Sequence, residues 1–232
     1  MPDIIDPDQF IISRKRKKYR FALFANSTLC FELDEWQQKF RTSPQESGLH
    51  FQGLPLDGVV IELGAGTGLF SVELAARHPD QQFVAIDVKA DRLQKGARLA
   101  VERGLSNVRF VRARADQLGE LFTENSVVSI WLTFPDPYPK KGSAGRRMTH
   151  PTFLSTYTKL LKREGSFCLK HDDPSFFQWS LTQLVSTGWI IRALSFDLHE
   201  SDLSDDYKIL TTYETRWLGE GKPTNFVRAV HD

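Results

Sequence analysis

The feature that most restricts the fold of this 232-residue chain is a glycine-rich turn that directly follows a short apolar run. Residues 59–63 are apolar except for one acid, and three glycines follow at alternate positions: Gly64, Gly66 and Gly68. Glycines let the backbone turn sharply out of a strand, and they let a ligand approach the chain closely at the start of the next helix. Residues 59–77 therefore predict a buried strand, a ligand-binding turn and an amphipathic helix.

After this turn, short apolar runs alternate with amphipathic stretches along the chain. The pattern predicts strands at 59–63, 82–87, 108–112, 127–134, 166–170 and 190–196, and helices at 69–77, 91–103, 153–162 and 175–187. Because strands that alternate with helices form right-handed βαβ units, we expect a doubly wound α/β fold with a mostly parallel sheet. Ligands of such folds bind at the carboxyl ends of the strands. Residues 1–55 lack a clean period and are expected to be a basic N-terminal extension with some helix, whereas 56–232 form one domain.

Composition indicates a soluble protein of the reducing cytoplasm. Hydrophobic residues make up 41% of the chain and charged residues 25%, and no apolar run is long enough for a membrane-spanning helix. The two cysteines, Cys30 and Cys168, are far apart, which argues against a zinc site or a disulfide scaffold. The first residues carry no pattern of a secretion signal. We therefore expect a cytoplasmic protein without a bound metal and without a membrane partner.

Positive charge is gathered in two places although the net charge is only +1. Residues 14–20 hold six cations in seven positions, and a second cluster consists of Lys140, Lys141, Arg146 and Arg147. Such local clusters can grip phosphates while acids elsewhere balance the total. A solvated surface segment is the alternative interpretation of each cluster.

Three of the predicted strands end in or lead to an acid, and these acids suit a nucleoside with a cationic group. The glycine turn reads G-x-G-x-G rather than the dinucleotide pattern G-x-G-x-x-G, and Glu62 just before it would repel a pyrophosphate but attract an ammonium or sulfonium. Asp87 is placed to accept both ribose hydroxyls, and Asp116 to accept from an adenine amino group. Either aspartate alone could instead be a helix N-cap. Together with the glycine turn, the acids resemble the S-adenosylmethionine site of Rossmann-like methyltransferases.

The most specific motif follows the strand at 127–134. Residues 134–141 read F-P-D-P-Y-P-K-K, and three prolines in five residues hold Asp136 and Tyr138 in a stiff backbone. This stretch resembles the F-P-D-P-W-P-K-K signature of the bacterial tRNA (guanine-N7-)-methyltransferase family. Residues 211–214, T-T-Y-E, with 219–223, G-E-G-K-P, are similar to the ending of that family. The resemblance extends over most of the chain and implies a seven-stranded Rossmann-like sheet flanked by helices.

The resemblance also implies a role for individual positions. It implies that S-adenosylmethionine is bound by the three glycines and by Glu62, Asp87, Asp116 and Asp136, and that Asp136 is the catalytic residue. It implies substrate-binding roles for Lys140, Asp172, Thr211 and Glu214, the last two at the start of a short helix that Gly221 closes. Lys141, Arg146 and Arg147 are expected to bind RNA. One departure is that residues 142–145, G-S-A-G, replace a basic run usual in the family, so several phosphate contacts are missing.

These features predict an enzyme that methylates N7 of a guanine in tRNA. N7 carries a lone pair on the major-groove edge and needs no general base, so we expect alignment of the reactants and carboxylates that stabilise the cationic product. Asp136 and Asp172 are the candidates for the second task, with Glu214 accepting from the base and Tyr138 stacking on it. The partner is tRNA, and the protein is a monomer or a homodimer. Three alternatives remain open: a methyltransferase of another substrate, a nicotinamide oxidoreductase, and a non-catalytic RNA-binding module.

Overall fold

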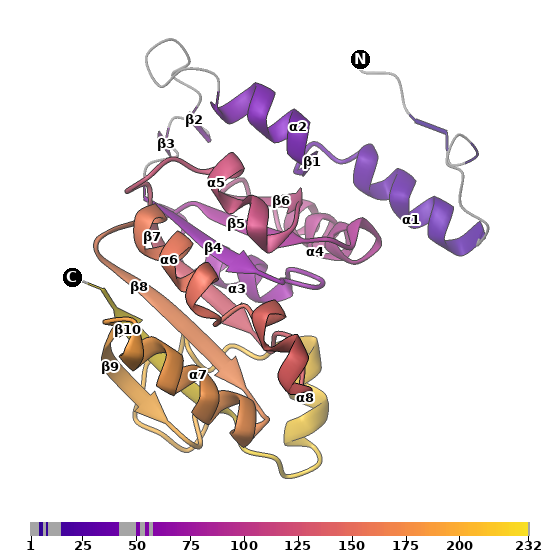
Figure 1. Cartoon of the computed structure of the whole chain (residues 1–232). Coiled ribbons are helices and arrows are strands. Elements are labelled where there is room, and N and C mark those ends of the chain that lie inside the picture. Colours follow the sequence, from indigo (N-terminus) through magenta and orange to yellow (C-terminus); the bar gives the residue numbers. More distant parts are fainter. Residues whose placement is uncertain are drawn as a thin grey trace.

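The protein is a layered α/β structure built on one large twisted sheet (Figure 1). The computed structural model describes residues 5–6, 8, 15–41, 50–51, 54–55 and 58–231. The strands of the large sheet are β1 (Cys30–Glu32), β4 (Val59–Leu63), β5 (Phe83–Asp87), β6 (Val108–Arg112), β7 (Val127–Thr133), β8 (Leu161–His171), β9 (Ile190–Ser195) and β10 (Asn225–Val230). Their order is β1-β6-β5-β4-β7-β8-β10-β9, and β2 (His50–Phe51) pairs with β3 (Leu54–Pro55) in a separate small sheet.

The sheet is parallel from β1 to β8 and turns antiparallel at its other edge. All pairs from β1–β6 to β7–β8 are parallel, whereas β10 runs antiparallel to both β8 and β9. The predicted fold class, a doubly wound, mostly parallel α/β sheet, is confirmed. The predicted number of seven strands is one short, because β1 pairs in parallel with β6 although its sequence was assigned to the N-terminal extension.

Helices cover both faces of the sheet and enclose a hydrophobic cluster on each. They are α1 (Lys15–Ala25), α2 (Leu33–Trp36), α3 (Leu69–Arg77), α4 (Ala90–Glu102), α5 (Leu118–Leu121), α6 (Pro151–Leu160), α7 (Pro174–Ser186) and α8 (Thr212–Leu218). Trp36, Tyr157 and Phe176 belong to the cluster under α2, α5, α6 and α7. Phe24 and Phe70 belong to the other cluster, together with residues of α3 and α4. The helix α1 of the predicted extension therefore packs on the same core as α3 and α4.

Two of the predictions concern residues that the structure does not describe. Arg14 of the basic run and residue 56, the predicted start of the main domain, lie outside the described residues. No helix in the described ranges is long and apolar enough to cross a membrane. The carboxyl ends of the parallel strands β4, β5, β6, β7 and β8 meet at one edge of the sheet, as parallel pairing requires. The candidate site residues follow these strand ends.

Candidate active site

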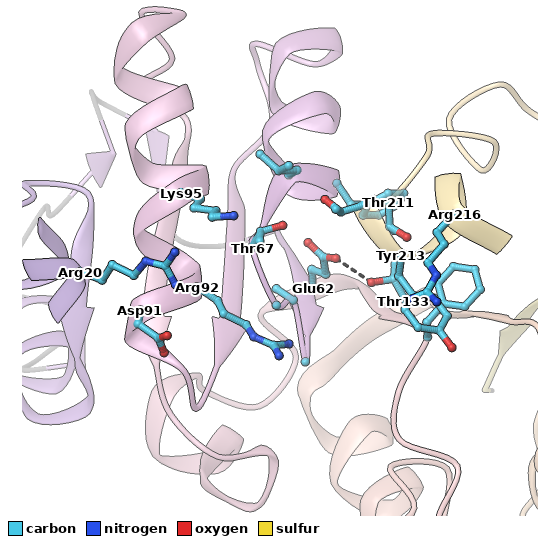
Figure 2. Close-up of a pocket in the computed structure, with 17 residues that line it drawn as sticks. Arg20, Glu62, Thr67, Asp91, Arg92, Lys95, Thr133, Thr211, Tyr213 and Arg216 are labelled. Carbon is cyan, nitrogen blue, oxygen red and sulfur yellow. Dashed lines mark hydrogen bonds between the residues drawn. The ribbon is translucent and has the colours of Figure 1, made fainter. Parts of the chain in front are cut away.

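Two adjoining pockets open at the carboxyl ends of the parallel strands. The first, about 600 Å³, lies between α1, α4 and the start of α8, with Glu62 and the glycine turn between them (Figure 2). The second, about 580 Å³, lies against the ends of β5 and β6 and the loop that follows β7. Both are lined by Gly64, Gly66, Arg92 and Phe134, so they meet at the glycine turn. Together they offer an elongated site for a ligand of nucleoside size or larger.

Glu62 is a buried acid in the first pocket. Its side chain is held on both sides. One oxygen accepts from the Ser71 hydroxyl at 2.6 Å. The other accepts from the Thr133 hydroxyl at 2.8 Å, the bond drawn in Figure 2. The residue is 2% exposed, and burial raises the pKa of its carboxyl to about 7, although these hydrogen bonds favour the ionised form. A carboxylate in this position is stabilised by a cationic ligand.

The glycine turn needs glycine at its last position. Gly68 precedes the first residue of α3 with φ at 69°, and a Cβ there would lie 2.6 Å from the Phe110 ring. Gly96 of α4 approaches the same turn, since a Cβ on it would lie 2.4 Å from the Thr67 carbonyl oxygen. Close packing of α4 on the turn therefore fixes the backbone on which a ligand would lie.

Asp87 and Asp116 both line the second pocket, but they are held in different ways. The two oxygens of Asp87 accept from the backbone N–H groups of Gly66 and Lys89, each at 2.8 Å, which fixes the carboxylate at the end of β5. Asp116 is exposed and forms an ion pair with Arg114, whose Nε lies 2.9 Å from one carboxylate oxygen. The hydrogen bond from Arg114 lowers the pKa of Asp116. The acids expected to bind the ribose and the base thus share one pocket.

The loop after β7 presents Asp136 to the second pocket. Phe134 and Tyr138 of this loop have positive φ angles, 53° and 41°, which non-glycine residues rarely adopt and which surrounding contacts must maintain. Arg147 supplies such contacts: its guanidinium donates to the carbonyl oxygens of Pro137 and Tyr138 at 3.0 and 3.1 Å. Of the residues expected to bind RNA, Arg147 is therefore engaged in holding the loop.

The remaining cations of this region reach toward solvent. Arg146 lies with its guanidinium 4.3 Å from the centre of the Tyr138 ring and lines the second pocket. Lys140 and Lys141 are exposed and line neither pocket. Residues 141–146 form a 3-10 turn in which the G-S-A-G segment adds no charge. The loop thus offers three exposed cations near Asp136.

His171 connects the loop of Asp136 to the loop of Asp172. Its Nε2–H donates to the Pro135 carbonyl oxygen at 3.0 Å, and its Nδ1 accepts from the Asp173 backbone N–H at 2.8 Å. These two bonds require the neutral ring, and burial lowers the pKa of His171 in agreement with that state. Asp172 itself lines neither pocket and its side chain is 15% exposed. His171 therefore holds the two loops in position relative to each other.

The start of α8 forms the other side of the first pocket. Thr211 and Tyr213 line it, whereas Glu214 is fully buried behind them. The Glu214 carboxylate accepts from the Lys170 ammonium at 2.7 Å and lies 2.8 Å from His199 Nε2. It also accepts from the Thr211 backbone N–H, as the Thr211 hydroxyl does from the Glu214 N–H. Glu214 therefore fixes the position of Thr211, and the side chain of Glu214 does not face the pocket.

The end of α8 and the lysine beneath it add two observations. The helix ends at Leu218, and Gly221, with φ at 73°, donates its N–H to the Leu218 carbonyl, in line with the expected closing role.

Lys170 is fully buried at the end of β8, 5.5 Å from the centre of the Phe70 ring. Sequence reasoning did not identify this lysine as part of the site, although a lysine within an apolar strand was the available signal.

Comparisons with known proteins agree with this geometry. A family described as "Putative methyltransferase" matches residues 57–227. The tRNA (guanine-N(7)-)-methyltransferase of Christiangramia forsetii is 37% identical over 172 residues, 73% of this chain and 77% of that one. The protein of the same description from Brevibacillus brevis is 36% identical over 162 residues, 70% of this chain and 75% of that one. Among solved structures, the 16S rRNA methyltransferase KamB superposes with a TM-score of 0.59 at 17% identity, covering 76% of this chain and 89% of that one, which shows a shared fold.

Proposed function

Since this chain belongs to the family of tRNA (guanine-N(7)-)-methyltransferases, we propose that it transfers the methyl group of S-adenosylmethionine to N7 of a guanine in tRNA. The observation that carries the proposal is the position of Asp136. The F-P-D-P loop brings this carboxylate into the same pocket as Asp87 and Asp116, and that pocket meets the one containing Glu62. An acid of the substrate motif thus lies beside the acids of a nucleoside site.

The residues present fit S-adenosylmethionine. Glu62 provides a buried carboxylate for the ammonium of the methionine part, next to a glycine turn where a Cβ on Gly66 would meet only open space. Asp87 would accept from the ribose hydroxyls and Asp116 from the adenine amino group. When bound, this cofactor supplies an electrophilic methyl group on a sulfonium. Phe134, which lines both pockets, lies at the junction where the cofactor and the guanine would meet.

The chain's own residues then have three tasks. N7 needs no general base, so the first task is to hold the guanine in line and to exclude water. Tyr138, held under Arg146, offers a ring on which an unstacked base can lie, and Thr211 offers a hydroxyl at the pocket wall. The second task is to stabilise the positive charge that develops on the purine, for which Asp136 and Asp172 are the carboxylates. The third is phosphate binding by Lys140, Lys141 and Arg146.

The geometry refines two of these assignments. Glu214 acts through Thr211, because its own carboxylate is already bound by Lys170 and His199. Arg147 acts through the loop, because its guanidinium holds the carbonyl groups that flank Tyr138. Both are therefore positioning residues in the proposed reaction, with the base and the phosphates left to their neighbours.

The test is mass analysis of nucleosides from an unmodified tRNA transcript incubated with the protein and S-adenosylmethionine. We expect 7-methylguanosine, and we expect Asp136→Asn to lower turnover by about 100-fold or more, as loss of one electrostatic contact to the transition state does. Asp80→Asn, at an exposed aspartate that lines neither pocket, is the matched control and should leave turnover unchanged. Absence of 7-methylguanosine with wild-type protein that binds the cofactor would refute the proposed substrate. Near-normal turnover of folded Asp136→Asn would refute the role of that residue.

A further inference from the structure

Three cations from two helices border one side of the first pocket. Arg20 comes from α1, and Arg92 and Lys95 come from α4, opposite Tyr213 and Arg216 of α8 (Figure 2). We call Arg20, Arg92 and Lys95 the basic rim. Arg92 and Lys95 are exposed, Arg20 is half-buried, and Arg92 also lines the second pocket. The rim therefore overlooks the place where cofactor and substrate would meet.

The local sequence explains why these charges share one face. Arg92 and Lys95 are three positions apart on α4, so they lie on one side of the helix, while Leu93 and Ala97 are buried beneath it. The helix α1 packs against α4 through Phe24, which belongs to the same hydrophobic cluster as Leu93. This contact brings Arg20 to the pocket, although it is 72 positions from Arg92 in the sequence.

The rim cations differ from their neighbours in having no acid of their own. Nearby, Arg103, which directly follows α4, pairs with Glu73 of α3 at 2.8 Å, and Arg98 pairs with Glu102 within α4 at 3.6 Å. Within the described part of the chain, no ion pair is observed for Arg20, Arg92 or Lys95. The acids at this pocket are Asp91, beside the rim, and Glu62, which is buried and held by hydroxyl groups. Unpaired cations at a pocket mouth are suited to an anionic ligand.

We infer that the basic rim binds phosphates of the RNA strand next to the target guanine. This inference rests on the proposed function and specifies which surface holds the RNA. The 3-10 turn at 141–146 has glycine, serine and alanine between its cations, so the loop of Asp136 offers Lys140, Lys141 and Arg146 for phosphate contacts and no charge between them. The rim lies across the first pocket from α8, so it can contact phosphates from a side of the pocket that the loop of Asp136 does not reach. An anion of another source, the carboxylate of the cofactor's methionine part, would meet the same cations and must be distinguished.

The experiment measures binding of an unmodified tRNA transcript across a salt series by fluorescence anisotropy. Each phosphate contact contributes about 0.7–0.9 to the slope of log affinity against log salt. The triple variant Arg20→Gln, Arg92→Gln, Lys95→Gln should therefore lower the slope by about 2–3 and weaken binding at moderate salt. Arg98→Gln is the matched control, because Arg98 is an exposed cation of the same helix that is paired with Glu102 and lines neither pocket. It should leave the slope unchanged.

The outcomes distinguish RNA phosphates from the cofactor carboxylate as the ligand of the rim, and they distinguish failure of this inference from failure of the proposed reaction. Calorimetric titration with S-adenosylmethionine should give the same affinity for the wild type and the triple variant. An unchanged salt slope overturns the inference, and a weaker cofactor affinity with an unchanged slope assigns the rim to the cofactor carboxylate instead. Wild-type protein that makes 7-methylguanosine while the triple variant keeps its slope refutes the rim alone. The proposed reaction alone is refuted by a different set of results: Arg98→Gln binds tRNA as the wild type does, the triple variant binds it more weakly, and the wild type makes no 7-methylguanosine.

Discussion

In the proposed reaction, the buried carboxyl of Glu62 should make the affinity for the cofactor dependent on pH. Burial raises its pKa from an ordinary 4.5 to about 7, so the group is about one-tenth ionised at pH 6 and about nine-tenths ionised at pH 8. If the ammonium of S-adenosylmethionine pairs with the ionised form, the fraction of competent protein rises by about tenfold over this range. The measurement is calorimetric titration with S-adenosylmethionine between about pH 6 and pH 8. We expect the ionisation of Glu62 by itself to lower the dissociation constant by about tenfold as the pH rises.

The variant Glu62→Gln separates the titration of the protein from that of the ligand. Glutamine keeps the shape: its carbonyl oxygen can accept from Ser71 while its NH2 group donates to the Thr133 hydroxyl, and it does not titrate. The amino group of the cofactor titrates equally with both proteins, so the ratio of wild-type to variant affinity isolates Glu62. We expect this ratio to rise with pH through about 7, the pKa of Glu62. Parallel pH profiles for the two proteins would refute the pairing of Glu62 with the cofactor.

Stability provides a second readout with a defined sign. Because the folded-state pKa lies above the unfolded value of 4.5, protonated Glu62 stabilises the fold fully below pH 4.5, and this contribution is lost as the pH rises through about 7. A shift of this size corresponds to roughly 3 kcal/mol. Urea unfolding of the cofactor-free proteins should therefore show Glu62→Gln gaining roughly 2–3 kcal/mol over the wild type between about pH 5 and pH 8. An equal pH dependence of both free energies of unfolding would contradict the raised pKa.

Two further substitutions test the packing behind the site. Lys170→Met leaves Glu214 without its cation and should lower the free energy of unfolding, measured in urea, by about 3–5 kcal/mol. A loss below about 1 kcal/mol would show that the pair is not buried as described. Gly96→Ala gains about 1 kcal/mol of helix propensity, but its Cβ would lie 2.4 Å from the Thr67 carbonyl oxygen, so we expect a net loss of stability and weaker cofactor binding. The control Gly119→Ala, where a Cβ meets nothing within 4 Å, should be neutral or stabilising, and equal effects of both changes would rule out the close packing.

The sequence predicts those strands and helices whose pattern of apolar and polar residues is clear within the segment itself. The strand Val59–Leu63 and the helix Leu69–Arg77 are found with the predicted bounds, because an apolar run, a glycine turn and an amphipathic stretch follow one another without interruption. The strand Asn225–Val230 was not predicted, since it follows a polar segment rich in glycine and carries an arginine in its middle. The strand Cys30–Glu32 has only three residues, too few for any period, and it is stabilised by pairing with β6.

The same distinction separates the predicted and the unpredicted parts of the site. The acids Glu62, Asp87 and Asp116 could be predicted because each lies at or just after the carboxyl end of a strand, and parallel topology brings these strand ends together whatever the rest of the chain does. Lys170 could not be assigned, because its partner Glu214 lies 44 residues further on and meets it only through the docking of α8. Arg20 reaches the pocket through a helix–helix contact that no local pattern specifies. Local signals thus locate the groups that follow strands, and tertiary packing decides which other charges join them.

The arrangement of charge along the pockets accounts for how an almost neutral chain could serve the two oppositely charged ligands of the proposed reaction. The ammonium of S-adenosylmethionine needs an anion beside it and an RNA strand needs cations, yet the methyl group and the guanine must meet within bonding distance. Glu62 is buried and held by hydroxyl groups, so it acts at contact range on a small ligand in the first pocket. The basic rim and Arg146 lie at the exposed edges, where phosphates can approach and where salt screens them over about 8–10 Å. The negative charge is buried and the positive charges lie at the exposed edges. The net charge of +1 therefore says little about which ligands the protein can bind, and the positions of the individual charges say more.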